Sequence, residues 1–328
     1  MSEKMSEVYE AYDMEILGAV RGRGSMILKT DRGIRQISPF DGSEERLEQE
    51  REFKENLYET GFHHIDRCMP NREGELITCD RYGNPYVMRE YFEGRECNPG
   101  SICDLNQAAA NLAIFHIRGR ELYAKEGRTY AYREPGNFRR KTQEMKKIRS
   151  FISKRPTKND FELLYIEAYD AFYRQAIDCQ AMMDACDRTN IAGHIGYCHG
   201  AYNYHSVLFC GGYLATVNFD RFHVGYQLTD LYQFIRKVME KNNYNFDMAV
   251  KIIEEYDRIL PLTREDYRYI YILYSYPEKF WKVSNRYMNS RKCWISPANL
   301  EKLSKLITDE QEKQKFLSDF CNHYGFTS

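Results

Sequence analysis

Long apolar runs are missing from this sequence of 328 residues. No stretch approaches the roughly 18 apolar residues of a membrane-spanning helix, and the N-terminal segment alternates charges where a secretory signal would be apolar. A charge bias is missing too, since the formal net charge is −1, which argues against bulk attraction to nucleic acid or an anionic membrane. We therefore expect a protein made and kept in the cytosol, with neither nucleic acid nor membrane as partner.

The ten cysteines form no C-x-x-C pair and no Cys/His quartet at the spacing of a metal site. A disulfide framework would need an oxidising compartment, which nothing in the sequence indicates. We therefore expect reduced thiols that serve as packing residues.

Tyrosine and phenylalanine are abundant, and basic residues cluster in one segment. The chain has 27 tyrosines and 18 phenylalanines, which fit aromatic core packing, with a surface built for assembly as the alternative. Residues 139–158 carry nine Lys/Arg against one Glu. Such a run is usually a solvated helix face, and binding of an anionic partner is the alternative.

The first part of the chain predicts strands with one helix. Residues 13–40 read as strands that turn at glycines and at an Asp-Arg-Gly sequence. An amphipathic helix follows, with Ser43 as its N-cap and Gly61 as its stop. Two more strands are expected at 75–80 and 85–91.

The rest of the chain predicts helices around one hairpin at 198–220. The pattern is helical at 104–116, at 160–187 and from Leu228 onward. The fold class is therefore α+β, with a small β-rich N-lobe at 1–93 and a larger, mainly helical C-lobe at 94–328.

The hairpin reads CHGAYNYHSVLF before a Gly-Gly turn and ATVNFD after it. It resembles the active-site hairpin of the aminoglycoside-phosphotransferase and choline-kinase superfamily, whose loop reads H-G-D-x-x-x-x-N and whose second strand ends in I-D-F. The resemblance implies a two-lobed protein kinase-like fold.

Four positions of that site carry other residues here. Phosphoryl transfer needs a carboxylate to orient the acceptor, an Asn and an Asp to hold Mg²⁺, and a Lys to grip the nucleotide phosphates. By the resemblance, these positions fall in turn on Ala201, Ser206, Asn218 and Ser38. A general base alone is worth about 10²–10⁴-fold in rate, so we predict that catalysis by the usual route is absent.

Two residues of the motif are retained. His199 keeps the His-Gly start of the loop and is expected to be scaffolding. Asp220, two residues after Asn218, is expected to point to the same side and could lend a carboxylate to a metal ion. Glu48 or Glu52 is the expected helix partner of the missing Lys, and solvated charges are the alternative for both.

A nucleotide, if one binds, would meet a further set of residues by the same resemblance. Gly22 and Gly24 lie where the superfamily has its phosphate-covering loop, and a plain hairpin turn is the alternative. The hinge-like segment YVMREYFEGREC contains Met88 and Glu90. No cofactor is expected, and ATP with Mg²⁺ would bind weakly, through these four residues with Asn218 and Asp220.

The chain also resembles the CotS-type spore-coat proteins of endospore-forming bacteria, most specifically in CHGAYNYHSVLF, VNFD and YPEKFWK. That resemblance implies synthesis in the mother cell, a place in the spore coat, and other coat proteins as partners. We predict a pseudokinase with a binding or structural role. The alternatives are a small-molecule phosphotransferase that uses displaced residues such as Asp220 and His205, and a nucleotide-dependent switch without turnover.

Overall fold

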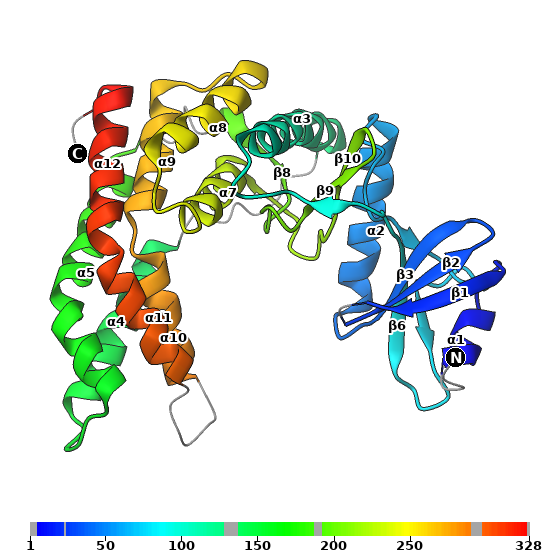
Figure 1. Cartoon of the computed structure of the whole chain (residues 1–328), viewed down its shortest axis with the longest axis horizontal. Coiled ribbons are helices and arrows are strands. Elements are labelled where there is room, and N and C mark those ends of the chain that lie inside the picture. Colours follow the sequence, from blue (N-terminus) through cyan, green and yellow to red (C-terminus); the bar gives the residue numbers. More distant parts are fainter. Residues whose placement is uncertain (1–4, 23, 128–136, 187–191, 290–296, 327–328) are drawn as a thin grey trace. The chain divides into compact units, whose positions relative to one another are not determined.

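The computed structural model describes residues 5–22, 24–127, 137–186, 192–289 and 297–326 (Figure 1). Two compact units make up the chain. The sheet unit comprises Met1–Arg128 and Gly196–His223, and the helical unit comprises Thr129–Ile195 and Val224–Ser328. The lobe division at residue 93 stays a prediction, because these units group the chain differently and keep the hairpin with the sheet.

The sheet unit is built on an antiparallel sheet in the order β1-β2-β3-β6-β4, with β5 also pairing with β6. Its strands are β1 (Ile16–Arg21), β2 (Met26–Thr30), β3 (Gly33–Pro39), β4 (Cys68–Met69), β5 (Ile77–Cys79) and β6 (Pro85–Glu90). These elements confirm the strands expected from the sequence.

The register of β3 against β6 decides which side chains face which side of the sheet. Ile37 pairs with Met88, and both pack into a core with α1 (Ser6–Glu10). Ser38 pairs with Val87 on the opposite side, where Val87 packs against Leu47 of α2 (Glu44–Glu59). Alternate residues of a strand point to opposite faces, so this side of the sheet is the one that meets α2.

The ends of α2 follow the sequence signals. The Ser43 side chain accepts a hydrogen bond from the Arg46 backbone N–H, which satisfies one of the unpaired donors of the first turn. Gly61 has φ +94° just beyond the last turn, a conformation that favours glycine. Both predicted boundaries are confirmed.

The remaining elements of the sheet unit surround the hairpin. Helix α3 (Ile102–Glu126) begins at the Ser101 N-cap and is followed by Gly127 at φ +59°. A three-stranded sheet has the order β10-β9-β7, with β7 (Arg95–Glu96), β9 (Val207–Cys210) and β10 (Tyr213–Thr216). Strands β8 (Ile195–Cys198) and β11 (His223–Tyr226) lie where the chain passes from one unit to the other.

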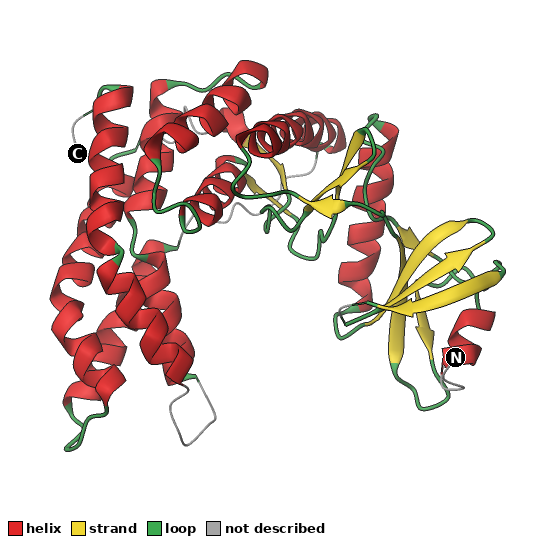
Figure 2. Ribbon diagram, viewed as in Figure 1, coloured by secondary structure: helices red, strands yellow, loops and turns green. Residues whose placement is uncertain are grey.

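The helical unit consists mainly of helices (Figure 2). They are α4 (Phe138–Ser153), α5 (Asp160–Asp184), α7 (Leu228–Met239), α8 (Phe246–Ile259), α9 (Arg264–Ser275), α10 (Glu278–Met288), α11 (Pro297–Thr308) and α12 (Glu310–Tyr324), with the short η2 (Ala192–His194). Helix α9 contacts α5, α7 and α12. A β-rich part and a mainly helical part confirm the predicted fold class.

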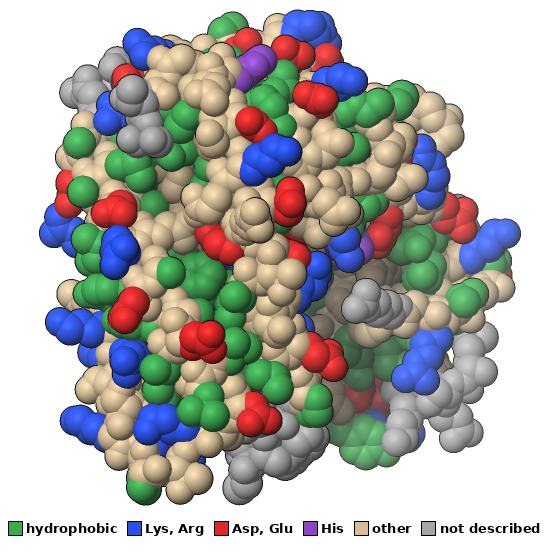
Figure 3. Space-filling view, turned by 60° about the vertical axis from the view of Figure 1, so that its left-hand side comes forward, with side chains coloured by type: hydrophobic (Ala, Val, Ile, Leu, Met, Phe, Trp, Pro, Cys, Tyr) green, Lys and Arg blue, Asp and Glu red, His purple; other side chains and the backbone are tan. Residues whose placement is uncertain are grey.

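The basic segment at 139–158 forms most of α4 and the turn after it. Its cations are partly neutralised, since Arg139 pairs with Asp184 at 2.8 Å and Arg140 with Glu144 at 2.7 Å. Side chains of both charge signs are interspersed over the face of the molecule shown in Figure 3. The solvated helix face and the anionic partner both stay predictions for this segment.

Candidate functional site

The kinase-like hairpin lies within the sheet unit. Strand β9 pairs antiparallel with β10, with Val207 opposite Thr216 and Cys210 opposite Tyr213. The loop at 199–206 leads into β9, and the segment at 217–222 follows β10. Every residue compared with the motif therefore belongs to one compact unit.

His199 joins the two sides of this hairpin. Its fully buried ring accepts a hydrogen bond at Nδ1 from the Ala201 backbone N–H at 3.2 Å. Nε2 then carries the proton and donates to the Val217 carbonyl at 3.1 Å. With these two hydrogen bonds, His199 links the start of the loop to the segment after β10.

Gly200 follows it in a close approach of two backbone segments. Its φ is +78°, and a Cβ at this position would lie 2.0 Å from the carbonyl oxygen of Arg221. Only glycine fits such a site without movement of the backbone.

Ala201 occupies the position of the general base, and Ser206 occupies the first position that would hold Mg²⁺. Neither side chain has a group free for that role. Ala201 presents a methyl group, which cannot accept a proton. The Ser206 hydroxyl is buried, donates to the Asn203 carbonyl at 2.8 Å and accepts from the Asn203 N–H at 3.0 Å. His205 is exposed and pairs with Glu96 at 2.6 Å. Ser206 therefore stabilises the turn of the loop, and His205 links the loop to Glu96 of β7.

The segment after β10 is held by its backbone. Asn218 has φ +69°, and its N–H donates to Asp66 Oδ2 at 2.9 Å. The Asp220 side chain is 72% exposed and lies 3.9 Å from Arg89. Phe219 between them is fully buried against Phe53 of α2. The buried Phe219 ring and the hydrogen bond of the Asn218 backbone together hold residues 218–220 in place.

The phosphate-gripping position on β3 has no cation. Ser38 lies on the α2 side of the sheet, as does Gln36, which donates to Ser25 Oγ at 2.8 Å. Arg89 on the neighbouring strand β6 faces the same way, since it pairs with Gln36. Arg89 lies 3.3 Å from Glu50 of α2. The ion pair between the sheet and α2 therefore uses Arg89 of β6, and not a residue of β3.

The helix partner is therefore Glu50, which the sequence did not single out. Glu48 is exposed and pairs with Arg51 at 2.9 Å, and Glu52 is exposed as well. The expectation that Glu48 or Glu52 is the helix partner is wrong, and both are exposed charges, because the buried stripe of α2 runs through Leu47, Glu50 and Lys54. The spacing i, i+3, i+7 in the sequence was the signal that could have found it.

Lys54 lies at the centre of the site and is fully buried. Its Nζ donates to Glu50 Oε1 at 2.6 Å and to the Asp66 carbonyl oxygen at 2.8 Å. It also lies 2.9 Å from Asp66 Oδ1. An ammonium group has three N–H donors, and three oxygens surround this one. We call Lys54, Glu50, Asp66 and Arg89 the Lys54 cluster.

Charge coupling within the Lys54 cluster shifts the ionisation of its members. Burial alone would raise the pKa of Glu50, but Lys54 and Arg89 outweigh it and lower that pKa. Burial alone would lower the pKa of Lys54, but Asp66 and Glu50 outweigh it and raise that pKa. Glu50 and Lys54 therefore stay charged at neutral pH, each stabilising the other.

The residues expected to meet a nucleotide are dispersed over different surroundings. The Gly22 N–H donates to the Ser25 carbonyl at 2.9 Å, and Gly24 has φ +72°, so both belong to the turn between β1 and β2. The Met88 side chain is fully buried in the core beside α1. Glu90 makes a two-point ion pair with Arg67 at 2.9 and 3.0 Å.

Mg²⁺ and ATP, which the fold would imply, fit this site poorly. Ser206 is engaged in its turn and Asn218 brings a neutral amide. Of the carboxylates nearby, Asp66 is paired with Lys54 and Asp220 is exposed. Magnesium prefers several hard oxygen ligands, with carboxylates among them. Lys54 is enclosed by oxygens of Glu50 and Asp66, and Arg89 is paired with Glu50. Within the described ranges, no three His, Cys, Asp or Glu residues are grouped closely enough to hold a metal ion.

The fold and the hairpin together define a protein kinase-like fold of the aminoglycoside-phosphotransferase type. The structure is similar to that of an aminoglycoside phosphotransferase from Alicyclobacillus acidocaldarius, with a TM-score of 0.79, 16% identity, and coverage of 96% of this chain and 95% of that one. Spectinomycin phosphotransferase is similar with a TM-score of 0.66 and 10% identity, covering 93% of this chain and 95% of that one. At these identities the likeness concerns the fold alone.

The sequence identifies the family. The family model described as "Spore coat putative kinase YutH" matches residues 5–320, so this chain belongs to that family of kinase-like spore-coat proteins. Spore coat protein S of Bacillus subtilis (strain 168) is 29% identical over 97 residues, which cover 29% of this chain and 28% of that protein. No helix within the described residues is long and apolar enough to cross a membrane.

Proposed function

We propose that this protein is a pseudokinase that serves as a binding or structural component of the bacterial spore coat or of its assembly. It is made in the mother cell, and its partners are other coat proteins. The family supports the setting in the spore coat, and the site supports the lack of phosphoryl transfer.

The Lys54 cluster is the observation that carries this proposal. A phosphate-gripping cation must have free donors that face the nucleotide. Lys54 is fully buried and has three oxygens within 2.9 Å. Pulling it away would leave Glu50 and Asp66 buried with one cation fewer, and breaking such a buried pair costs about 3–5 kcal/mol. The cluster is stable as a closed structural unit.

The acceptor side supports the same conclusion. Ala201 replaces the general base, and the lost proton transfer is worth about 3–5 kcal/mol in the barrier. Restoring Ala201→Asp alone should not create activity, because Asn218 and Ser38 still lack the charges that hold Mg²⁺ and the phosphates.

The test is nucleotide binding followed by turnover. A ligand at about 100 times its dissociation constant would add about 2.7 kcal/mol of stability, so thermal unfolding of the purified chain with millimolar Mg-ATP reports binding directly. We expect no shift, and no phosphorylated product from a panel of alcohol and amine acceptors.

Two other outcomes have distinct meanings. Product formation that disappears in an Asp220→Ala variant would overturn the proposal in favour of a phosphotransferase with displaced residues. A stabilising shift with Mg-ATP but no product would replace the inert site with a nucleotide-dependent switch. In-vitro binding to isolated coat proteins then tests the assembly role.

A further inference from the structure

Helix α4 of the helical unit presents a basic face to the solvent. The exposed cations of this helix and its C-cap are Arg139, Arg140, Lys146, Lys147 and Lys154. The one carboxylate of the helix, Glu144, is half-buried and pairs with Arg140 at 2.7 Å. The outer side of α4 therefore carries positive charge without an exposed carboxylate to balance it.

Three of these cations, Lys146, Lys147 and Lys154, have no ion-pair partner within the described part of the chain. Like charges on neighbouring positions of one helix face repel one another, and an oppositely charged surface removes that repulsion. Phe151 lies among them and is 51% exposed. Aromatic rings are enriched where proteins meet. The face has the charge and the apolar group of a docking surface for an acidic partner.

Helix α2 of the sheet unit presents the opposite charge. Its exposed carboxylates are Glu44, Glu45, Glu48, Glu52 and Glu59. Arg51 is the one exposed cation of this helix, and it pairs with Glu48 at 2.9 Å. Glu50 and Lys54 are buried on the other side of the helix. The acidic face of α2 is therefore separate from the Lys54 cluster.

The two faces match in length and in the spacing of their charges. Each set extends over fifteen positions, from Arg139 to Lys154 and from Glu44 to Glu59, which is about 22 Å along a helix axis. In an antiparallel alignment three pairs of opposite charge coincide: Lys154 with Glu44, Lys146 with Glu52, and Arg139 with Glu59. One chain thus carries both halves of a complementary pair of surfaces.

We infer that α4 of one copy of this chain docks on α2 of a second copy, and that the protein self-associates through these two unlike faces. A contact between unlike faces joins copies head to tail. The inference goes beyond the proposed function, because both faces lie outside the kinase-like hairpin and their pairing does not depend on whether a nucleotide binds.

Sedimentation velocity of the full-length chain tests self-association. Exposed charge pairs are individually weak, and their range falls from about 10 Å in 0.1 M salt to about 3 Å in 1 M salt. We expect the average mass to rise across the micromolar range of protein concentration in low salt. The dissociation constant should be at least about tenfold higher in about 0.5 M NaCl.

Two results of that measurement would overturn the inference. One is a monomer at every concentration, which includes the cases in which α4 binds acidic residues of its own chain or of another protein. The other is self-association that salt does not weaken, because the contact would then not depend on charge.

Charge reversal identifies the two faces. The variant Lys146→Glu/Lys147→Glu on α4 and the variant Glu48→Lys/Glu52→Lys on α2 should each self-associate at least about tenfold more weakly than the wild type.

A matched control separates these faces from net charge. Lys251→Glu/Lys302→Glu makes the same change of net charge as the α4 variant, at exposed positions of α8 and α11. It should associate like the wild type. A loss as large as that of the α4 variant would assign the effect to net charge and overturn the docking.

Mixing the two face variants is the decisive measurement. The reversed α4 of one variant is complementary to the reversed α2 of the other, and their unchanged faces are complementary as well. The mixture, and a single chain with all four changes, should therefore recover association, which a misfolded variant could not do. Absence of recovery would refute the pairing of α4 with α2, whatever the result with Mg-ATP.

Discussion

At the residue scale, the position of Lys54 decides whether the kinase-like site has a cation available for a phosphate. Active sites of this type take their lysine from the third strand, where it can reach a phosphate. Here the lysine is on α2, seven residues after Leu47 on the buried stripe of the same helix. The residue type needed for phosphate binding is therefore present, but its surroundings convert it into part of the core.

Lys54→Met should strongly destabilise the protein. The substitution keeps the apolar length of the side chain but leaves Glu50 and Asp66 buried with one cation fewer, and breaking such a pair costs about 3–5 kcal/mol. Urea unfolding measures the loss. Lys29→Met, at an exposed position of β2, should stay within about 0.5 kcal/mol of wild type. Equal stability of the two variants would contradict the structural role of Lys54.

Stability should also fall in acid because of Glu50. Its folded-state pKa is below the usual 4.5, so the unfolded chain takes up the proton first as the pH falls. The contribution is therefore complete above about pH 4.5 and is lost as the pH passes through the lower folded-state pKa. The urea midpoint of Glu50→Gln should change less between pH 6 and pH 3 than that of the wild type. Parallel profiles would argue against this linkage.

At the scale of elements, the hairpin keeps the geometry of a kinase-like active site without its chemistry. His199 bridges the two sides, Gly200 admits the Arg221 carbonyl, and Phe219 anchors the following segment on α2. These interactions depend on packing and backbone hydrogen bonds, which do not need the catalytic carboxylates. The element can therefore persist as a scaffold.

Gly200→Ala tests that scaffold. A Cβ would lie 2.0 Å from a backbone oxygen at a positive φ, so the loop must move, and the strained backbone alone costs about 1–3 kcal/mol. We expect a lower melting temperature and faster amide exchange in residues 199–206. Gly18→Ala, where a Cβ would meet nothing within 4 Å, provides the control. If Gly200→Ala changed neither the melting temperature nor the amide exchange, the close approach of the Arg221 carbonyl would not be required for the fold.

At the scale of the whole molecule, both units are stabilised by aromatic and thiol packing. The nine cysteines that the structure describes are free, and seven of them are buried. Burial raises the pKa of Cys68 to about 11 and that of Cys179 to about 12. Thiolate is the reactive form, so these side chains should be inert in the native protein.

Thiol labelling of the native chain should therefore be selective. Cys79 and Cys103 are exposed and should react rapidly with a maleimide, while Cys68, Cys97 and Cys179 should react only after unfolding. Peptide mapping by mass spectrometry reports each position separately, and labelling in urea is the control. Rapid labelling of Cys179 in the native state would show that the helical unit opens readily.

The sequence alone determined the main elements and the family. Hydrophobic spacing, Ser43 and Gly61 placed α2, the Gly-Gly turn placed the hairpin, and the motif residues gave the kinase-like fold. Such signals are local, because caps, turns and periodicity act within a few residues of the chain. The replaced positions Ser38, Ala201, Ser206 and Asn218 could be named for the same reason.

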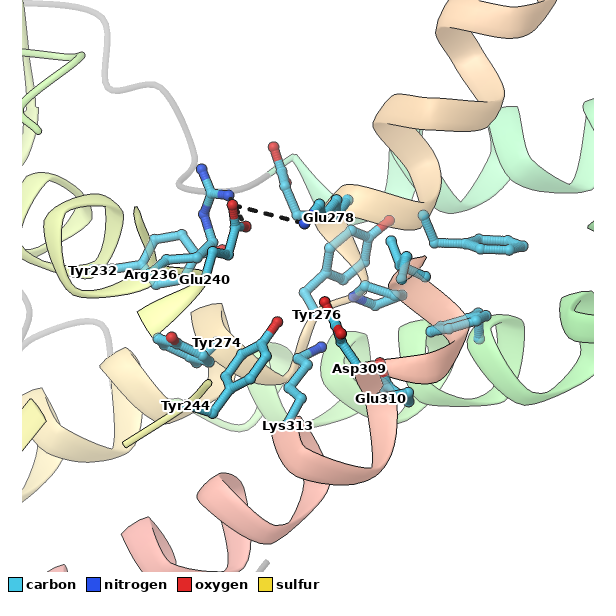
Figure 4. Close-up of a pocket in the computed structure, with 15 residues that line it drawn as sticks. Tyr232, Arg236, Glu240, Tyr244, Tyr274, Tyr276, Glu278, Asp309, Glu310 and Lys313 are labelled. Atoms are coloured by element: carbon cyan, nitrogen blue, oxygen red, sulfur yellow. Dashed lines mark hydrogen bonds and ion pairs between the residues drawn. The ribbon is translucent and has the colours of Figure 1, made fainter. Parts of the chain in front are cut away.

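Only the tertiary structure decided which charges meet. Lys54, Asp66 and Arg89 come from a helix, a connecting segment and a strand, and their pairing depends on the register of β6 and on the side of α2 that faces the sheet. The pocket in the helical unit shown in Figure 4 likewise has walls from α7, α9 and α12. Electrostatic coupling and burial depend on distances in space, which local sequence patterns do not fix.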